Sequence, residues 1–309
     1  MESLSELVKN AKSITSSEML YLIEETELIL DREKRQGKQG DLIIKSGLVY
    51  LPAPCNLVVI GDIHGDIASL TWILENSSIT EDLANGQKKI LLLGDYGDRG
   101  GNSPDVYALL LRLKTMFPDS VILLRGNHEG PQDLQVVPYD LPHQLKDKFS
   151  NQSNRICEEM QELFQDIPHA AILPKRLLLL HGGVPSLATS LKDIEQANLT
   201  HPSATHLEEI LWNDPVEDMR GTTVSPRGAG RLFGEDVTHK ILGLANVKVL
   251  VRSHEPCHNG VAVSHKGMVL TLFSRKGPPY NNAHAAYLRI VSAEASTSAY
   301  ELSASAQFF

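Results

Sequence analysis

Aspartate, asparagine and histidine recur beside glycine or at the end of an apolar run in five separate segments. These segments are Gly61-Asp62-Ile63-His64-Gly65, Gly94-Asp95-Tyr96-Gly97-Asp98-Arg99-Gly100, Gly126-Asn127-His128-Glu129, His181-Gly182-Gly183 and Ser253-His254. Carboxylate, imidazole and amide ligands suit Mn²⁺, Fe and Zn²⁺, whereas Ca²⁺ favours shells made only of oxygen. One carboxylate can bridge two ions, and a pair of metals beside arginines is suited to hydrolysing phosphate esters. The residue types therefore predict a two-metal centre.

Each segment follows a short run rich in Val, Ile and Leu, which is typical of a strand buried on both faces. The runs are Leu57–Ile60, Ile90–Leu93, Val121–Leu124, Leu177–Leu180 and Val247–Val251. Helical patterns at about 66–77 and 103–116 alternate with them, which favours a layered α/β core. Because ligands bind beyond the carboxyl ends of strands in such sheets, we expect five loops from five neighbouring strands to converge on one site.

The two ends of the chain differ in pattern from this middle part. Residues 2–36 carry apolar side chains at helical spacing, and residues 36–40 break the pattern. We therefore expect an N-terminal helical segment, residues 1–40, packed on a single domain of residues 41–309. Near the other end, three apolar runs at 260–263, 268–273 and 286–291 predict a meander, followed by a final strand or loose tail over 292–309.

Composition limits the classes of partner and the compartment. The 309 residues carry a formal net charge of -9, which argues against a binder of nucleic acid. Three widely spaced cysteines favour a reducing compartment over a disulfide framework. The N-terminus lacks a signal-peptide pattern, and no apolar run approaches the ~20 residues that cross a bilayer. We expect a cytoplasmic protein, or a nuclear one in a eukaryote, without nucleic-acid or membrane partners.

Taken together, the motifs resemble the signature of a known enzyme family. With Arg125 before the third, the first four motifs are similar to those of the phosphoprotein phosphatase (PPP) family of serine/threonine phosphatases, which belongs to the calcineurin-like metallophosphoesterases. The similarity continues through Leu211–Pro215, Ser225–Gly230, Phe233-Gly234 and Arg252–His254, and covers roughly residues 55–290. The resemblance implies a four-layer α/β fold, with a β-sandwich of two mixed sheets flanked by helices. It also implies a hydrolase of phosphoserine and phosphothreonine in proteins.

The resemblance further implies a role for each matching residue. The metal ligands would be Asp62, His64, Asp95, Asn127, His181 and His254, with Asp95 bridging two divalent ions. The residues that bind the substrate phosphate would be Arg99, Arg227, Asn127 and Tyr280. His128, oriented by Asp98, would protonate the leaving alkoxide while a hydroxide bound to both metals attacks phosphorus directly. Mn²⁺ is the first expectation for the ions, with Fe and Zn²⁺ as alternatives.

The chain departs from the familiar eukaryotic members of this family in two places. After Glu129 it reads Gly130–Leu134 and Pro138–Pro142, and Ser274–Asn282 replaces an Ala-Pro-Asn-Tyr-Cys stretch. The segments Ser225–Gly230 and Arg252–Pro256 look more like archaeal, bacterial or protist branches. Two alternatives stay open: a small-molecule phosphoesterase, such as a diadenosine tetraphosphate hydrolase, and a non-catalytic scaffold. The identity of the phosphoprotein substrate and of any regulatory partner is also open.

Overall fold

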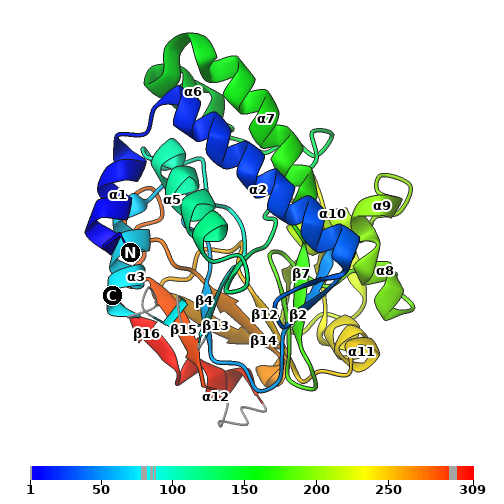
Figure 1. Ribbon diagram of the computed structural model, residues 1–309. Coiled ribbons are helices and arrows are strands. Elements are labelled where there is room, and N and C mark those ends of the chain that lie inside the picture. Colours follow the sequence, from blue (N-terminus) through cyan, green and yellow to red (C-terminus); the bar gives the residue numbers. More distant parts are fainter. Residues whose placement is uncertain (1, 78–81, 84–85, 87, 292–297) are drawn as a thin grey trace.

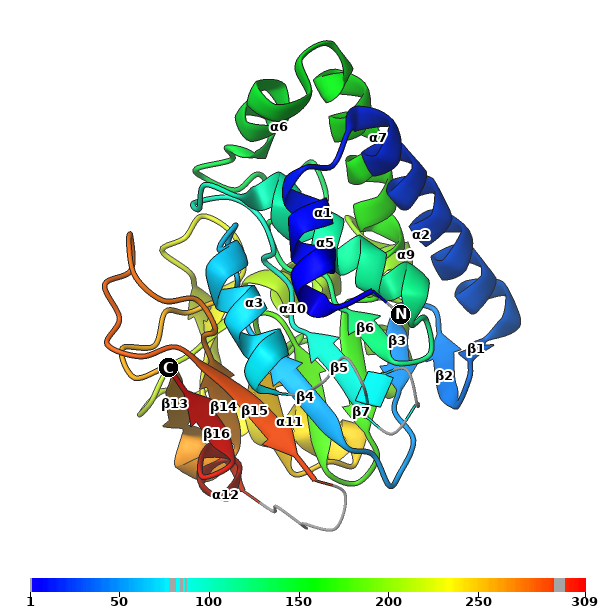
Figure 2. The same ribbon diagram turned by 60° about the vertical axis from the view of Figure 1, so that its left-hand side comes forward.

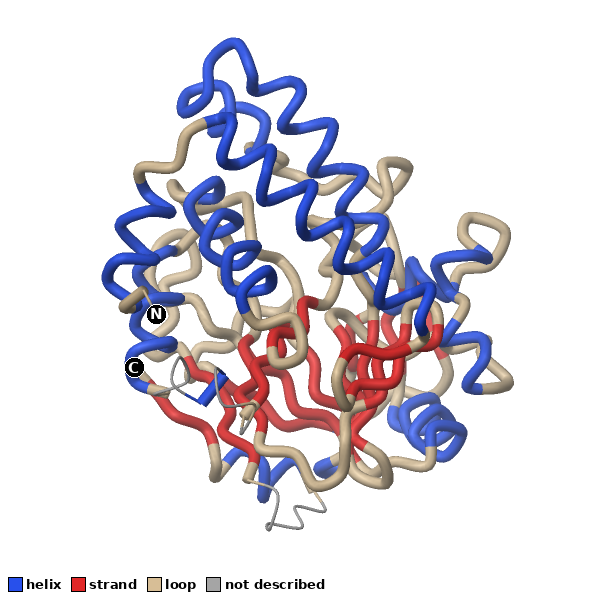
Figure 3. The backbone as a smooth tube through the Cα atoms, viewed as in Figure 1, coloured by secondary structure: helices blue, strands red, loops and turns tan. Residues whose placement is uncertain are grey.

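Two large mixed β-sheets lie face to face at the centre of the molecule (Figure 1, Figure 3). The computed structural model describes residues 2–77, 82–83, 86, 88–291 and 298–309. One sheet has five strands, in the order β16 (Ala306–Phe308), β15 (Ala286–Ile290), β4 (Leu57–Ile60), β5 (Lys89–Leu92) and β6 (Val121–Leu123). Strands β4, β5 and β6 are parallel, and β15 is antiparallel to both β4 and β16.

The second sheet has eight strands. Their order is β1 (Lys38–Gln39), β2 (Leu42–Lys45), β3 (Leu48–Tyr50), β7 (Ala170–Leu173), β8 (Leu177–Leu180), β12 (Val249–Arg252), β14 (Val269–Leu272) and β13 (Val261–Ser264). A small third sheet contains β10 (Thr222–Val224), β11 (Arg231–Phe233) and β9 (Asp214–Pro215).

Helices cover the outer faces of both large sheets. Over the five-stranded sheet lie α1 (Leu4–Lys12), α2 (Ser16–Gln36), α3 (Ile67–Asn76), α5 (Ser103–Met116), α6 (Leu141–Phe149) and α7 (Ser153–Asp166). Over the eight-stranded sheet lie α8 (Leu191–Glu195), α9 (Ala197–Thr200), α10 (His206–Trp212) and α11 (Glu235–Ala245). Helix α12 (Ala299–Ser303) packs at one end of the sandwich, and two short 3₁₀ turns lie at Ser150–Gln152 and His265–Gly267.

As predicted, the central strands are apolar on both faces. Each sheet packs against helices on one face and against the other sheet on the opposite face. In β4, Leu57 and Val59 lie in the core between the sheets, while Val58 and Ile60 face the helices. Strand β8 shows the same alternation, because successive side chains of a strand point to opposite faces. The layers therefore run helix, sheet, sheet, helix, which confirms the predicted four-layer α/β sandwich.

The N-terminal helical pattern corresponds to two helices. Helix α1 ends at Lys12, and Thr15 starts α2 with a capping box in which its side chain and that of Glu18 satisfy each other's backbone N–H groups. Leu7 and Leu22 bury their side chains in the core beneath these helices. No helix among the described residues combines the length and the apolar character needed to span a membrane.

The predicted meander near the C-terminus is wrong in its pairing. Strands β13 and β14 do form an antiparallel pair, but β15 crosses to the five-stranded sheet and lies between β4 and β16 (Figure 2). The apolar pattern shows that these strands are buried, and it does not show which sheet edge each one completes. The expected final strand is β16, and residues 292–297 lie outside the described residues.

The expectation of five neighbouring strands is also corrected. The loops that carry the first three motifs follow β4, β5 and β6 in one sheet, and the other two follow β8 and β12 in the second sheet. Each set of strands is adjacent and parallel within its own sheet. The loops still meet, because the two sheets are stacked with these strand ends at the same side.

Candidate metal centre

Two overlapping groups of buried side chains lie where the five loops meet. One group contains His64, Asp95 and His128, and the other contains Asp95, His181 and His254. Within each group, one potential ligand atom of every residue lies within 4.8 Å of the others. Asp95 belongs to both groups, which is the arrangement that a shared carboxylate needs.

Backbone carbonyls orient two of the imidazole rings. His64 donates from Nδ1 to the Gly97 carbonyl at 2.9 Å, and His181 donates from Nδ1 to the Leu93 carbonyl at 3.1 Å. A carbonyl only accepts, so in the neutral ring the lone pair lies on each Nε2 atom. These Nε2 atoms lie 3.4 and 3.3 Å from the two oxygens of Asp95. Both rings therefore present a metal-binding atom toward the same carboxylate.

The Asn127 amide meets two imidazole nitrogens and a carboxylate at the cluster. Its Oδ1 lies 2.9 Å from His181 Nε2 and 3.0 Å from His254 Nδ1. An amide turned the other way would donate to these same nitrogens and to Asp95, so the amide faces the cluster in either orientation. Asp62 Oδ2 is buried and has no hydrogen-bond partner among the described residues. This donor set fits divalent cations.

Burial sets the protonation of two of the imidazole rings. It lowers the pKa of His64 and of His254 well below the ordinary value, which keeps both rings neutral and able to bind a metal. Burial and the nearby charge of Asp95 raise the pKa of Asp62. Two carboxylates held this closely out of water repel each other, and a bound cation would relieve that repulsion.

Asp95 is held by backbone contacts from two other loops. Its φ of 54° is left-handed, and its carbonyl accepts hydrogen bonds from the N–H groups of Ile63 and His64 at 3.1 and 2.9 Å. The preceding Gly94 has a φ of 108°, and a Cβ there would lie 2.3 Å from the Gly126 nitrogen. Only glycine allows this close approach of the β5 and β6 loops.

Glu129 is part of the third sequence motif, but the motif alone did not indicate what this residue does. Its buried carboxylate accepts hydrogen bonds from the backbone N–H groups of Asp95, Tyr96 and Gly126 and from the Tyr107 hydroxyl. It therefore joins the loop after β5 to the loop after β6. The one signal in the sequence was its place directly after His128.

His128 and Asp98 form a buried pair beside the cluster. His128 Nδ1 lies 2.6 Å from Asp98 Oδ2, and its Nε2 atom has no partner among the described residues. The other oxygen of Asp98 accepts from the N–H groups of Asp140 and Leu141 at the start of α6, at 2.9 and 2.7 Å. The start of helix α6 thus orients the Asp98 carboxylate, which in turn orients the His128 ring.

The two predicted phosphate-binding arginines lie on different sides of the cluster. Arg99 Nη1 lies 3.4 Å from His64 Nε2 and donates to the Tyr280 hydroxyl at 2.9 Å. Arg227 lies in the loop between β10 and β11 and donates to Asp214 Oδ2 at 2.6 Å. The other oxygen of Asp214 lies 3.9 Å from His254 Nε2, so Arg227 borders the cluster through Asp214.

Sequence reasoning gave no role to Asp214 or to Ser253. Asp214 also accepts from the buried Arg252 at 2.9 Å. Ser253 Oγ lies 2.5 Å from Asp62 Oδ1, and thereby joins the β12 loop of one sheet to the β4 loop of the other. Both residues stand within motifs that the sequence singled out, but their contacts span about 38 and 191 residues of chain.

Comparison with known proteins shows the family to which this chain belongs. Residues 55–258 match the family model described as calcineurin-like phosphoesterase. The chain belongs to this family. It is 32% identical over 290 residues to a probable serine/threonine-protein phosphatase of Encephalitozoon cuniculi (strain GB-M1), covering 92% of this chain and 58% of that protein. The chain thus spans little more than half the length of this relative.

Further relatives agree with the predicted resemblance to phosphoprotein phosphatases. A protein phosphatase 2A catalytic subunit from Dictyostelium discoideum is 32% identical over 243 residues, covering 78% of this phosphoesterase and 74% of that relative. A solved serine/threonine phosphatase from Saccharomyces cerevisiae, described as similar to human PP5, superposes with a TM-score of 0.75 at 25% identity, covering 90% and 83% of the two chains. A cold-active protein tyrosine phosphatase at 21% identity shares the fold, with a TM-score of 0.58, covering 80% and 76%.

Proposed function

We propose that this phosphoesterase is a metal-dependent serine/threonine protein phosphatase. The observation that carries the proposal is the buried cluster around Asp95, with His128 oriented beside it and two arginines at its border. The identity of 32% with a probable serine/threonine-protein phosphatase and with a protein phosphatase 2A catalytic subunit supports the same reading.

We propose that two divalent ions are held by Asp62, His64, Asp95, Asn127, His181 and His254, with Asp95 shared. When bound, such a pair supplies positive charge for the phosphoryl oxygens and lowers the pKa of a water molecule into the neutral range. The mixture of carboxylate, imidazole and amide donors supports Mn²⁺ as the first choice, with Fe and Zn²⁺ as alternatives.

The remaining side chains handle the phosphate and the leaving group. Arg99 and Arg227 would bind the phosphoryl oxygens, with Tyr280 orienting the first and Asp214 the second. His128 would donate its Nε2 proton to the departing serine or threonine oxygen, while Asp98 holds Nδ1–H. Although burial lowers the pKa of His128, Asp95 and Asp98 raise it more, which favours the protonated form that an acid needs.

Two alternative functions are less well supported than this one. A non-catalytic scaffold has no need of a paired His128 and Asp98 or of a complete donor set, and this chain keeps both. A small-molecule phosphoesterase would use the same centre, so substrate preference decides. With Mn²⁺ added, we expect a phosphoserine peptide to be hydrolysed with a higher kcat/KM than diadenosine tetraphosphate. The reverse preference would replace the proposal with the small-molecule activity, and no turnover of either would favour the scaffold.

Three further assignments belong to the proposal. Residues 1–40 would be a helical segment packed on a catalytic domain of residues 41–309, which is supported by the burial of Leu7 and Leu22. The free cysteines, Cys55, Cys157 and Cys257, support a reducing compartment such as the cytoplasm. The net charge of -9 supports a phosphoprotein over a nucleic acid as the partner.

A further inference from the structure

A large cavity opens directly beside the candidate acid His128. Its volume is about 980 Å³, and Asn127 and His128 form part of its wall. Most of the rest of the wall comes from the segment 130–139, from α7, from α9 and from Lys34 near the end of α2. The first of these is the segment in which the chain departs from the familiar members of its family. Helix α2 of the N-terminal segment therefore helps to shape a space next to the metal centre.

The wall of this cavity contains one buried cation that forms no ion pair within 4.0 Å among the described residues. Arg125 is 3% exposed, its Nε donates to the Glu129 carbonyl at 2.6 Å, and its Nη2 has no partner among the described residues. No carboxylate of the described part of the chain lies within 4.0 Å of its guanidinium, since none of the ion pairs there includes it. A buried guanidinium is stable only when its donors are satisfied, so Arg125 is poised to take an anion.

The other charges on the wall are already compensated or hydrated. Asp166 pairs with Lys34 at 2.5 Å, and Asp133 lies 3.0 Å from His201 with about half of its side chain exposed. The carboxylate of Glu129 is occupied by four donors, none of which is Arg125. Arg125 is thus the wall cation that is left with unused donors.

The proposed reaction puts the substrate polypeptide at this cavity. His128 protonates the oxygen of the departing serine or threonine, so that oxygen must lie within hydrogen-bond reach of Nε2. The chain that carries the oxygen then lies within a few Å of His128, where the cavity opens. Apolar side chains such as Phe164 and Leu207 line the same space and can pack against neighbouring residues of that polypeptide.

We propose that this cavity binds the polypeptide next to the phosphorylated residue, and that Arg125 binds an acidic group of that polypeptide. The group is a carboxylate or a second phosphate, since a guanidinium fork suits both. Arg125 is then a specificity residue, and the preferred substrates are phosphoproteins with an acidic residue close to the site of hydrolysis. This inference rests on the proposed phosphatase function.

The test compares phosphoserine peptides that differ in one flanking residue. Alanine, aspartate or a second phosphoserine is placed at each flanking position in turn, and kcat/KM is measured with Mn²⁺. We expect the best acidic peptide to exceed its alanine counterpart by about tenfold or more, which is typical of a hydrogen bond to a charged group. The aspartate and phosphoserine series show which anion the cavity takes.

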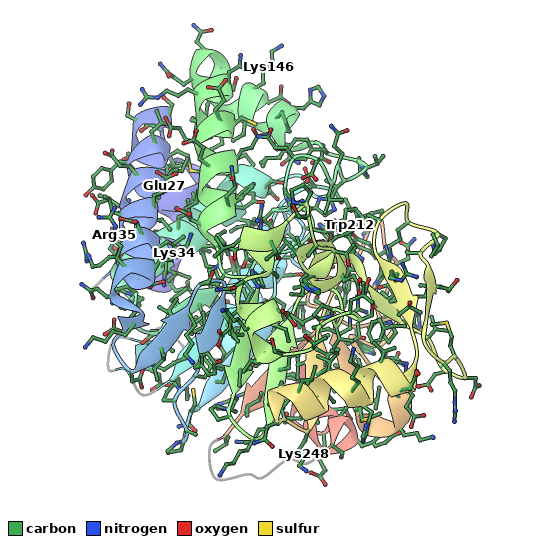
Figure 4. All side chains as sticks on the ribbon, turned by 90° about the vertical axis from the view of Figure 1, so that its right-hand side faces the viewer. Glu27, Lys34, Arg35, Lys146, Trp212 and Lys248 are labelled. Carbon is green, nitrogen blue, oxygen red and sulfur yellow. The ribbon has the colours of Figure 1, made fainter. Side chains whose placement is uncertain are left out.

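Variants then assign the preference to Arg125. The acidic-to-alanine ratio should fall to about one in Arg125→Gln and persist in part in Arg125→Lys. As a matched control, Arg35→Gln removes an equal charge from α2, where Arg35 lies next to Lys34 in sequence with 78% of its side chain exposed (Figure 4). The ratio should be unchanged in that variant. Because each ratio is taken within one variant, a change in overall activity cancels.

Two outcomes would overturn the inference. The first is an equal kcat/KM for acidic and alanine peptides in the unmodified protein, and this result does not depend on whether the variants fold. The second is a folded Arg125→Gln variant that keeps the whole preference for acidic peptides. Hydrolysis of p-nitrophenyl phosphate separates this failure from that of the proposed function. An enzyme that cleaves the aryl phosphate and phosphoserine peptides without acidic preference keeps its function and loses the inference, while absence of all turnover overturns both.

Discussion

Among single residues, Asp95 contacts both groups of candidate metal ligands, which its sequence motif does not indicate. Its two oxygens face His64 and His181, and its Oδ1 also accepts from the His128 backbone N–H at 3.0 Å. Its own backbone is fixed by contacts to the β4 and β6 loops. A change of this one side chain therefore alters both candidate metal positions.

Asp95→Asn should abolish the binding of both ions. The amide keeps the shape of the side chain but removes the charge that two cations would share. We expect the manganese content after gel filtration to fall from about two ions per chain to well below one, with turnover lost in parallel. Asp31→Asn, a change of equal charge at a half-exposed site on α2, should leave the metal content unaltered. An Asp95→Asn protein that retained two ions would contradict the shared-ligand proposal.

His128→Asn should leave the metals in place and slow the chemistry. A lost general acid typically costs ~10²–10⁴-fold in rate, and the cost is greatest when the leaving group is a poor one. The decrease in kcat should therefore be large for a phosphoserine peptide and much smaller for p-nitrophenyl phosphate. Equal decreases for the two substrates would show that His128 does not protonate the leaving oxygen.

At the scale of elements, helix α2 is tied to the body of the protein by a buried ion pair. Glu33 lies 2.6 Å from Lys114 of α5, and both side chains are less than 10% exposed. Lys114 also donates to the carbonyls of Pro118 and Val121, so one ammonium group links α2, α5 and β6. The cavity wall that Lys34 contributes depends on this docking, because Lys34 follows Glu33 in the same helix.

Glu33→Ala should destabilise the fold by roughly 3–5 kcal/mol, since it leaves the Lys114 ammonium buried without its counter-charge. Urea denaturation followed by circular dichroism would measure the free energy of unfolding. Glu25→Ala, on the same helix and outside the core, is the matched control and should change it by well under 1 kcal/mol. A loss in Glu33→Ala no greater than in the control would show that the buried pair does not hold α2 in place.

Another face of α2 carries an unfavourable charge. Burial, together with the charges of Glu159, Asp166, Glu162 and Glu24, raises the pKa of Glu27 to about 7 (Figure 4). The folded state therefore binds this proton more tightly than the unfolded state, whose pKa is 4.5. The stabilising contribution of the protonated group is complete below pH 4.5 and is lost as the pH rises through 7.

Glu27→Gln should remove this pH dependence. The variant is expected to melt at a higher temperature than the unmodified protein at pH 8, with a difference that shrinks as the pH falls toward 5. Melting curves at several pH values would measure it, and Glu2→Gln, at an exposed position outside the cluster, serves as the control. A difference in melting temperature that stays constant between pH 5 and 8 would contradict the elevated pKa.

At the scale of the whole molecule, the candidate centre is a junction between the two sheets. Asp62 follows β4 in the five-stranded sheet, and it accepts hydrogen bonds from Ser253 and from the His254 backbone after β12 in the other. Asp95 and His181 face each other across the same junction. Ions bound there would hold the sheets together, so their binding should stabilise the whole fold.

Mn²⁺ should therefore raise the unfolding midpoint of the protein. At a concentration 100 times Kd, binding to the folded state alone contributes ~2.7 kcal/mol, which is a rise of several degrees for a chain of this size. Differential scanning calorimetry with and without Mn²⁺ would measure the shift, and a chelator should reverse it. The shift should be absent in Asp95→Asn. A midpoint independent of Mn²⁺ would show that the folded protein does not bind the ion tightly.

Much of the fold and of the site could be read from local patterns. The runs at 57–60 and 177–180 coincide with β4 and β8, and the helix at 103–116 coincides with α5. Apolar periodicity succeeds here because it depends on residues close in sequence. The same holds for the motif residues around Asp95, whose glycines and strand ends mark the loops in which they lie.

The sequence by itself determined which side chains were available for chemistry and that they would follow buried strands. Only the tertiary structure decided that β15 joins the five-stranded sheet, that the five loops come from two sheets, and that Glu129, Asp214 and Ser253 hold the site together. It also decided that Arg125 borders a cavity and forms no ion pair within the described part of the chain. The physical reason is that strand pairing and the compensation of buried charge depend on contacts between residues far apart in the chain, and local periodicity carries no information about them.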